Sequence, residues 1–243
     1  MYSFDSVIRY SELDNEGKLN IEALLNYFQD CSIFHSESLG YGVDYLKEHN
    51  LMWVLSSWQI VIDRLPALCE KVTVGTFPYD FKGFFGYRNF FLQEESGAYI
   101  AKANTLWTLL DTQTLRPVVP PADMKEAYVV SPKLEMHDAG RKISVPAGGS
   151  FEEQITVGVH HLDTNHHVNN VQYVKMAMAF LPDGFTVSGL RVEYRKQALL
   201  HDVIKPYVIL AKQENGQSTY TVSLQDENGG VYVNIEFCGT EKV

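Results

Sequence analysis

The sequence predicts an α+β fold in which one helix packs on an antiparallel sheet, and it predicts this unit twice. Two observations support the prediction. A short polar segment at residues 13–20 recurs at residues 162–169, and each copy precedes a helix-like stretch and a series of strand-like stretches. Consecutive strands joined by hairpins pair antiparallel, and a helix with one apolar stripe must bury that stripe against them.

The repeat itself is a loop followed by a helix. LDNEGKLN at 13–20 aligns without a gap on LDTNHHVN at 162–169, sharing Leu, Asp, an aliphatic residue and Asn. After the first copy, apolar residues recur at helical spacing, namely Ile21, Leu24, Leu25 and Phe28. After the second copy the apolar spacing is similar, and Asn169 or Asn170 is suited to cap the helix.

Strand-like stretches follow each helix. In the first copy they span residues 52–63, 71–81, 84–95 and 98–111, and in the second copy 186–196, 202–213, 218–227 and 230–239. A further strand is expected before each helix, near 2–10 and 150–160. ENGQ and ENGG mark hairpin turns. The alanine-leucine pairs in RLPALCEKVTV and RKQALLHDVIK match as well, at a smaller offset.

We therefore expect an N-terminal domain at 1–130, a linker at 131–148 and a C-terminal domain at 149–243. The linker contains Pro, Gly and mixed charge without periodicity. At 243 residues, 45% hydrophobic and 21% charged, the composition is that of an ordinary globular protein. The formal charge of −10 argues against nucleic acid as the main partner.

Other sequence signals concern location and cysteine chemistry. No signal-peptide pattern opens the chain, and no apolar run reaches the roughly 18 residues that could span a membrane, so we expect a cytoplasmic protein. Three widely spaced cysteines without a CxxC pattern suggest neither a disulfide framework nor a cysteine-based zinc site.

The two copies of the loop differ in chemistry. Both contain Asp, but the second has Asn165 and His167 where the first has Glu16 and Lys18. Only the second copy therefore keeps residues that donate, accept and exchange protons near neutral pH. This asymmetry suggests that one half performs chemistry while the other supplies a binding cavity. The alternative is that both loops only cap a helix, with Asp and Asn at its N-terminus.

The same residues also suggest a metal site as an alternative. Either His160 or His161 could converge with His166 or His167, and Asp163 could be a third ligand. None of the spacings matches a known metal motif, so we predict neither a metal nor another cofactor.

DTNHHVNNVQY resembles the D-x-N-x-H-V-N-N-x-x-Y signature of acyl-acyl carrier protein thioesterases. GKLNIEALLNYFQDCS, WTLLDTQTLRPVVPP and VEYRKQA extend the resemblance along nearly the whole chain. The family consists of tandem double hotdog proteins, each half a long helix wrapped by an antiparallel β-sheet. The resemblance implies hydrolysis of the thioester that joins a fatty acyl chain to the phosphopantetheine arm of acyl carrier protein, which ends or diverts fatty acid synthesis.

The resemblance also assigns catalytic residues, Asp163, Asn165 and His167. His167 suits proton transfer to and from water, Asn165 could hold the carbonyl or the water, and Asp163 could orient the imidazole or attack as a nucleophile. One departure matters. The family commonly has Glu and Cys where this chain has Gln197 and Ala198. Gln197 cannot act as a base because an amide does not titrate, although it can position a water.

Further expectations follow from the resemblance. Asn169, Asn170, Tyr173 and Trp58 are predicted to contact substrate. Acyl carrier protein is the expected partner, and basic residues that could receive it are Arg191, Arg195, Lys196 and Lys205. An acyl-CoA thioesterase on the same fold and a non-catalytic acyl-binding module remain alternatives. The sequence leaves open assembly as a homodimer and the preferred acyl chain.

Overall fold

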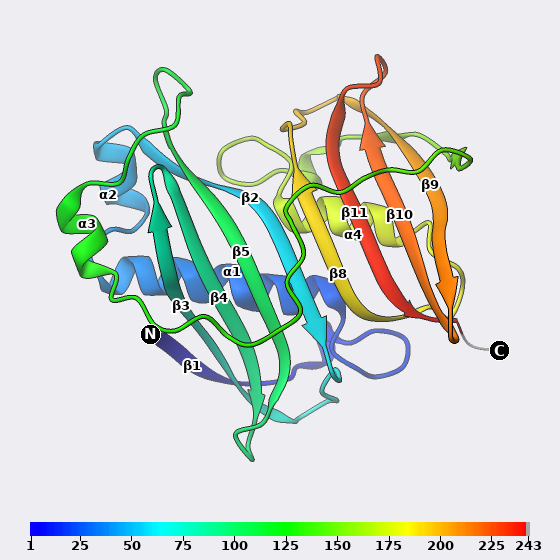
Figure 1. The fold of residues 1–243 in the computed structure, drawn as a ribbon, viewed down its shortest axis with the longest axis horizontal. Helices are drawn as coiled ribbons and strands as arrows, with labels where there is room; N and C mark the ends of the chain where they lie inside the picture. Colours follow the sequence, from blue (N-terminus) through cyan, green and yellow to red (C-terminus); the bar gives the residue numbers. More distant parts are fainter. Residues whose placement is uncertain (242–243) are drawn as a thin grey trace. The chain divides into compact units, whose positions relative to one another are not determined.

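The computed structural model describes residues 1–241 and contains two compact units (Figure 1). The first comprises Met1–Ser56 and Ile60–Asp138, and the second comprises Ser57–Gln59 and the chain from Ala139 onward. The division at Asp138 falls inside the predicted linker. Each unit is an antiparallel sheet with one main helix on it, so the predicted α+β double hotdog is confirmed.

The sheet of the first unit has the order β1-β3-β4-β5-β2. Its strands are β1 (Tyr2–Val7), β2 (Leu51–Ile62), β3 (Lys71–Lys82), β4 (Phe85–Glu94) and β5 (Tyr99–Asp111). Two short helices, α2 (Val43–Glu48) and α3 (Ala122–Ala127), accompany the main helix α1 (Ile21–Ser38).

Helix α1 forms where the apolar spacing predicts it. Asn20 caps its start by accepting the amide of Ala23 at 2.7 Å. Leu24, Leu25 and Phe28 are fully buried, and the ring of Phe28 packs on that of Phe90 in β4 at 5.4 Å. The helix therefore covers the face of the sheet to which Phe90 points, and Asn89 points to the opposite face.

The sheet of the second unit has the order β8-β11-β10-β9-β6. Its strands are β8 (Thr186–Tyr194), β9 (Val203–Glu214), β10 (Gln217–Gln225), β11 (Val231–Thr240) and the short β6 (Ser150–Phe151), while β7 (Ile155–Thr156) also pairs with β9. Its helix α4 (Asn170–Met178) is half as long as α1. The β9–β10 hairpin turns at Asn215 and Gly216, whose φ values of 52° and 77° suit the two central positions of a type I′ turn.

The continuous strand expected near 150–160 is wrong. The segment makes two separate two-residue pairings with β9, at Phe151–Tyr207 and Ile155–Ile204, and ends in a 3-10 turn at Val159–His161. The three residues between the pairings, Glu152–Gln154, are all exposed and polar, so they offer no apolar face to hold the segment on the sheet.

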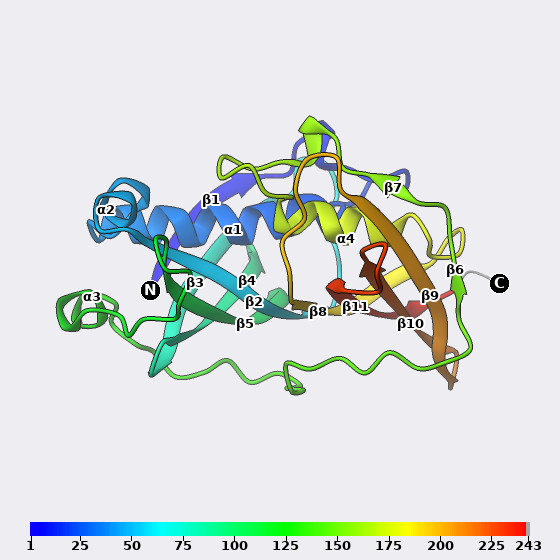
Figure 2. The ribbon, with the colours of Figure 1, turned by 90° about the horizontal axis from the view of Figure 1, so that it is seen from above.

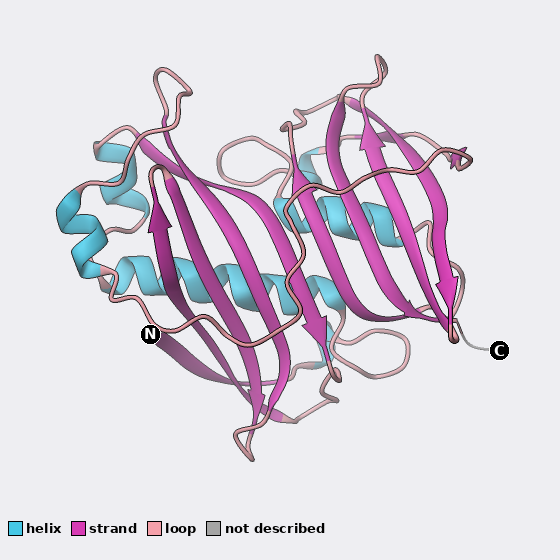
Figure 3. Cartoon of the chain, viewed as in Figure 1, coloured by secondary structure: helices cyan, strands magenta, loops and turns pink. Residues whose placement is uncertain are grey.

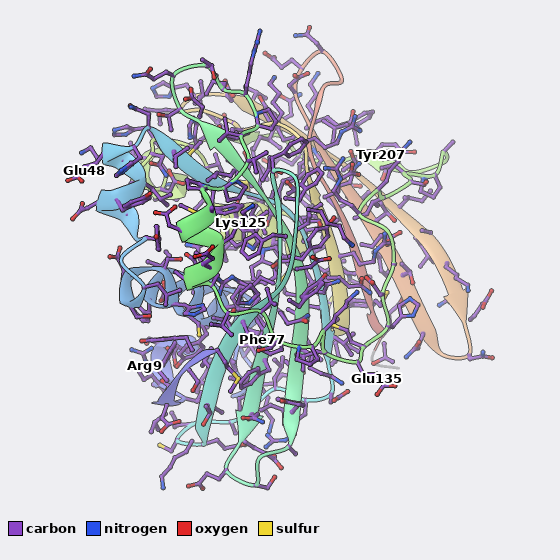
Figure 4. All side chains as sticks on the ribbon, turned by 60° about the vertical axis from the view of Figure 1, so that its left-hand side comes forward. Arg9, Glu48, Phe77, Lys125, Glu135 and Tyr207 are labelled. Atoms are coloured by element: carbon purple, nitrogen blue, oxygen red, sulfur yellow. The ribbon has the colours of Figure 1, made fainter. Side chains whose placement is uncertain are left out.

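The predicted linker is hydrogen-bonded to the sheets rather than loose. Figure 3 draws it as loop, and Figure 2 shows it on the side of each sheet opposite the helix. In the first unit the amide of Leu134 donates to Asn89 at 3.0 Å, and Lys102 donates to the carbonyl of Glu135, labelled in Figure 4. In the second unit the amide of Ile143 donates to Glu193 at 3.0 Å.

Candidate active site

The loop at Leu162–Asn169 is a tight turn held by one carboxylate. The amide of Asp163 donates to the carbonyl of His167 at 2.8 Å, and Leu162 bridges Val168. Asp163 Oδ1 accepts the amides of Asn165 and His167 at 2.8 and 3.2 Å. One carboxylate oxygen of Asp163 is thus committed to backbone, and no side-chain hydrogen bond joins Asp163 to His167 within residues 1–241.

The first copy of the loop has the same backbone. The amide of Asp14 donates to the carbonyl of Lys18 at 2.7 Å, and Asp14 Oδ1 accepts the amides of Glu16 and Lys18 at 2.9 and 3.0 Å. The alternative, that Asp and Asn in both loops cap the following helix, is therefore correct for the asparagines and not for the aspartates. Asn20 and Asn169 cap the two helices, whereas each Asp holds the turn before its helix. Each Asp therefore has a structural role in its turn, in both copies.

His167 and Asn165 are the groups that this turn presents. His167 is half-buried, and its Nδ1 is buried without a hydrogen-bond partner among the described residues. Asn165 is exposed. Buried side-chain nitrogens are normally hydrogen-bonded, so Nδ1 of His167 is an exception among the described residues.

Gln197 precedes Ala198, which is hydrogen-bonded to this loop. The amide of Val168, which follows His167, donates to the carbonyl of Ala198 at 3.0 Å. The amide of Ala198 donates to the hydroxyl of Tyr173 in α4 at 2.7 Å. Gln197 itself is exposed and lies just beyond the end of β8. The fold therefore brings the segments that contain His167 and Gln197 together.

The hydrogen bonds also correct the alignment of the alanine-leucine pairs. In the first copy the amide of Leu19 donates to the carbonyl of Pro66 at 2.8 Å, as that of Val168 does to Ala198. Pro66 is thus the counterpart of Ala198, one residue away from the register that the pairs suggest. Leu65, not Pro66, is therefore the counterpart of Gln197.

The residues predicted to contact substrate have the following positions. Asn169 accepts the amide of Val171 at 2.9 Å as the helix cap, and the carbonyl of Asn170 accepts the hydroxyl of Tyr194 at 2.9 Å. Tyr173 is 2% exposed, and burial raises the pKa of its hydroxyl to about 12. Trp58 is also buried, within the part of β2 that clusters with the second unit.

His161 has a structural role that the sequence did not reveal. Its Nδ1 accepts the amide of Gly158 at 3.0 Å, which closes the 3-10 turn before the loop. In the first copy Glu12 accepts the amide of Arg9 in the same way at 2.8 Å. Burial is the main cause that lowers the pKa of His161. Because Nδ1 is occupied, it is not available to a metal.

The described residues contain no group of three or more His, Cys, Asp or Glu side chains arranged to hold a metal ion. No helix in that part of the chain is long and apolar enough to cross a membrane.

Two of the four basic candidates for partner binding are already paired. Arg191 forms an ion pair with Glu236 and donates to linker carbonyls. Lys196 pairs with Asp226 at 2.8 Å and lies 4.8 Å from the ring centre of Tyr232. Among the residues proposed, Arg195 and Lys205 remain better suited to an external acidic partner.

Comparison with known proteins agrees with this geometry. Residues 2–128 match the acyl-ACP thioesterase N-terminal domain, and residues 146–238 match the acyl-ACP thioesterase C-terminal domain. The chain belongs to the acyl-ACP thioesterase family. Its repeat is therefore the two-domain repeat of that family, with the loop that contains His167 in the C-terminal domain.

Curated members of the family extend beyond the region matched. The chain is 28% identical over 241 residues to acyl-[acyl-carrier-protein] hydrolase FATB1, chloroplastic, of Cuphea viscosissima, covering 91% of this chain and 57% of that protein. It is 28% identical over 216 residues to the palmitoyl-acyl carrier protein thioesterase, chloroplastic, of Gossypium hirsutum, covering 81% of this chain and 52% of that protein. The chain thus spans a little over half the length of these relatives.

Solved structures share the fold across the whole chain. An acyl-ACP thioesterase from Bacteroides thetaiotaomicron superposes with a TM-score of 0.86 at 20% identity, covering 98% of this chain and 96% of that one. The 12:0-ACP thioesterase from Umbellularia californica also gives 0.86 at 20% identity, covering 99% and 97%. At this identity the likeness establishes the fold.

Proposed function

We propose that this member of the acyl-ACP thioesterase family hydrolyses the thioester between a fatty acyl chain and acyl carrier protein, releasing a free fatty acid. The observation that supports this most is the loop pair. The two loops have the same backbone hydrogen bonds. Only the second has an imidazole and a carboxamide at the positions of His167 and Asn165, where the first has Lys18 and Glu16. Family membership adds the substrate class, and the printed names of the relatives are consistent with it.

Each residue has a separate role in the proposed reaction. His167 takes a proton from water as the oxygen attacks the carbonyl carbon, and it returns that proton to the thiolate as the carbon–sulfur bond breaks. Asn165 donates from its amide to the carbonyl or positions the water. Gln197 positions the water from the neighbouring segment without exchanging protons.

Asp163 contributes mainly through the turn. Its Oδ1 accepts two backbone amides, so an attack on substrate would have to use Oδ2. We therefore assign proton transfer to His167 and loop geometry to Asp163.

The start of α4 offers a donor for the developing oxyanion. Asn169 accepts the amide of Val171 with its side chain and the amide of Gln172 with its carbonyl. In the described residues the amide of Asn170 has no such partner, and it lies at the positive end of the helix. Asn169, Asn170, Tyr173 and Trp58 stay predictions as substrate contacts, as does a cytoplasmic location, and assembly as a homodimer stays open.

The test measures thiol release from matched acyl carrier protein and CoA thioesters of one chain length. His167→Ala and Asn165→Ala should each lower kcat at least about 100-fold, the size of a general-base or oxyanion contribution. Lys18→Ala is the matched control, because Lys18 occupies the position of His167 in the first loop. It should leave kcat within about two-fold.

The other outcomes separate the alternatives. Faster turnover of the CoA thioester would identify an acyl-CoA thioesterase, and saturable acyl binding without turnover would identify a binding module. Wild-type rates in His167→Ala would show that the assigned site is wrong. Loss of activity with a chelator would restore the metal hypothesis.

A further inference from the structure

Ala198 is hydrogen-bonded through both of its backbone groups. Its amide donates to the hydroxyl of Tyr173 at 2.7 Å, and its carbonyl accepts the amide of Val168 at 3.0 Å. Ala198 is 0% exposed and Tyr173 is 2% exposed, so water does not compete for these bonds. One buried residue thus joins helix α4 to the loop that ends at Val168.

The first copy retains only half of this connection. The carbonyl of Pro66 accepts the amide of Leu19 at 2.8 Å, but proline has no amide hydrogen to donate. Tyr173 is the fourth residue after the capping Asn169, and the fourth residue after Asn20 is Leu24, which is 0% exposed. In the first copy the donor and the acceptor are therefore both absent.

The first unit forms the same loop backbone without this connection. Leu24 and Pro66 fill the same positions in the first unit with the same loop backbone and without burying an amide–hydroxyl pair. A leucine would bury apolar area without the cost of desolvating a hydroxyl. The hydroxyl occurs only in the copy that has Asn165 and His167.

We propose that Tyr173 is a positioning residue, whose hydroxyl fixes Ala198 and thereby sets the segment of Gln197 against the loop of His167. This inference rests on the proposed function. Without the hydroxyl, the amide of Ala198 is buried and unpaired, and the segment must move to find another partner. Displacement of a catalytic group by about 1 Å can lower the rate up to about 100-fold.

The variant is Tyr173→Phe, which removes one oxygen and keeps the ring. We expect kcat to fall about ten-fold while KM for the acyl thioester stays within about two-fold, because the hydroxyl sets geometry rather than contacting substrate. A fall in melting temperature with kcat unchanged would overturn the proposal and leave the hydroxyl a purely structural role. A rise in KM with kcat unchanged would overturn it in favour of substrate contact.

Tyr27→Phe is the matched control. Tyr27 is 5% exposed in α1, and its hydroxyl donates to Glu12 at 3.0 Å and lies 2.9 Å from Ser6 Oγ. It therefore also joins a helix to the turn before a loop, in the copy without His167. Its loss should lower the melting temperature to a similar degree and keep kcat within about two-fold. An equal loss of kcat in the control would show that general destabilisation lowers the rate, which overturns the proposal.

Amide hydrogen exchange separates this inference from the proposed function. In the folded wild type the amides of Ala198 and Val168 should exchange slowly, and Tyr173→Phe should accelerate both at least about ten-fold relative to amides of β11. Unchanged exchange overturns the role of Tyr173 whatever the activity. A wild type that hydrolyses no thioester, but whose exchange responds to Tyr173→Phe, overturns the proposed function and confirms the connection.

Discussion

The N-terminal unit should lose stability in mild acid because of one buried histidine. His35 in α1 is 5% exposed, and its Nδ1 lies 3.0 Å from Nη1 of Arg88 in β4. A guanidinium only donates, so Nδ1 must accept and the imidazole must be neutral. Burial, followed by the charge of Arg88, lowers the pKa of His35 to about 3. The aromatic rings of Tyr2 and Tyr128 also pack against the imidazole.

The sign and size follow from linkage. Because the folded pKa lies below the ordinary value of 6.5, the stabilisation is complete above pH 6.5 and is lost as pH falls toward 3. Within that window each pH unit costs about 1.4 kcal/mol. At pH 5 the unfolding free energy should therefore be about 2 kcal/mol lower than at pH 7.5. This is a large part of the roughly 5–15 kcal/mol that stabilises a domain.

Urea unfolding at pH 5.0 and 7.5 measures this loss. In His35→Asn the amide oxygen can accept from Arg88 and does not titrate. The variant should be less stable at pH 7.5, because it loses ring packing, but should lack the drop of about 2 kcal/mol. His49→Asn removes an exposed imidazole from the same unit and should keep the wild-type drop. If His35→Asn loses as much stability as wild type between the two pH values, the reasoning is refuted.

Two further predictions concern the loops. Asp163→Ala should lower the unfolding free energy by about 1–3 kcal/mol through loss of two turn hydrogen bonds. Asp14→Ala should lower the unfolding free energy by a similar amount without changing kcat. Unequal falls in melting temperature for the two variants would contradict the same structural role for the two aspartates. His161→Gln keeps an acceptor for Gly158 without titrating. Because burial lowers the pKa of His161 below 6.5, its contribution to stability is fully present above pH 6.5 and declines as pH falls below that value. Wild type should therefore lose more melting temperature than the variant between pH 7 and 5. Equal losses would contradict this.

The architecture could be predicted from the sequence because the patterns that indicate it are local. Helical spacing after Asn20 and the Asn-Gly turn at Asn215 depend on neighbours within a few residues, and the structure has both. The prediction of a continuous strand at 150–160 was wrong because the alternation of apolar and polar residues there resembles that of a strand. Whether it pairs depends on β9, which lies some fifty residues later in the chain.

The site was only partly readable. The spacing of Asp163, Asn165 and His167 predicts this loop as the candidate site. It does not predict that the Asp holds the turn in both copies, because that depends on backbone geometry. The connection from Tyr173 to Ala198 joins residues 25 apart through one backbone amide, which no side-chain pattern encodes. The alanine-leucine pairs align Ala67 with Ala198, one residue away from the structure, in which Pro66 is the counterpart of Ala198. Matching side chains need not share hydrogen bonds.

The duplicated loop separates what the fold requires from what chemistry requires. Features common to both copies, such as the turn carboxylate and the capping asparagine, serve the backbone, because the first copy keeps them without an imidazole. Features confined to the second copy have no such structural necessity. Among them are His167, Asn165 and the amide–hydroxyl pair of Ala198 and Tyr173. Gln197 belongs with them, since its counterpart in the first copy is apolar Leu65. We propose that function, rather than folding, explains these side chains.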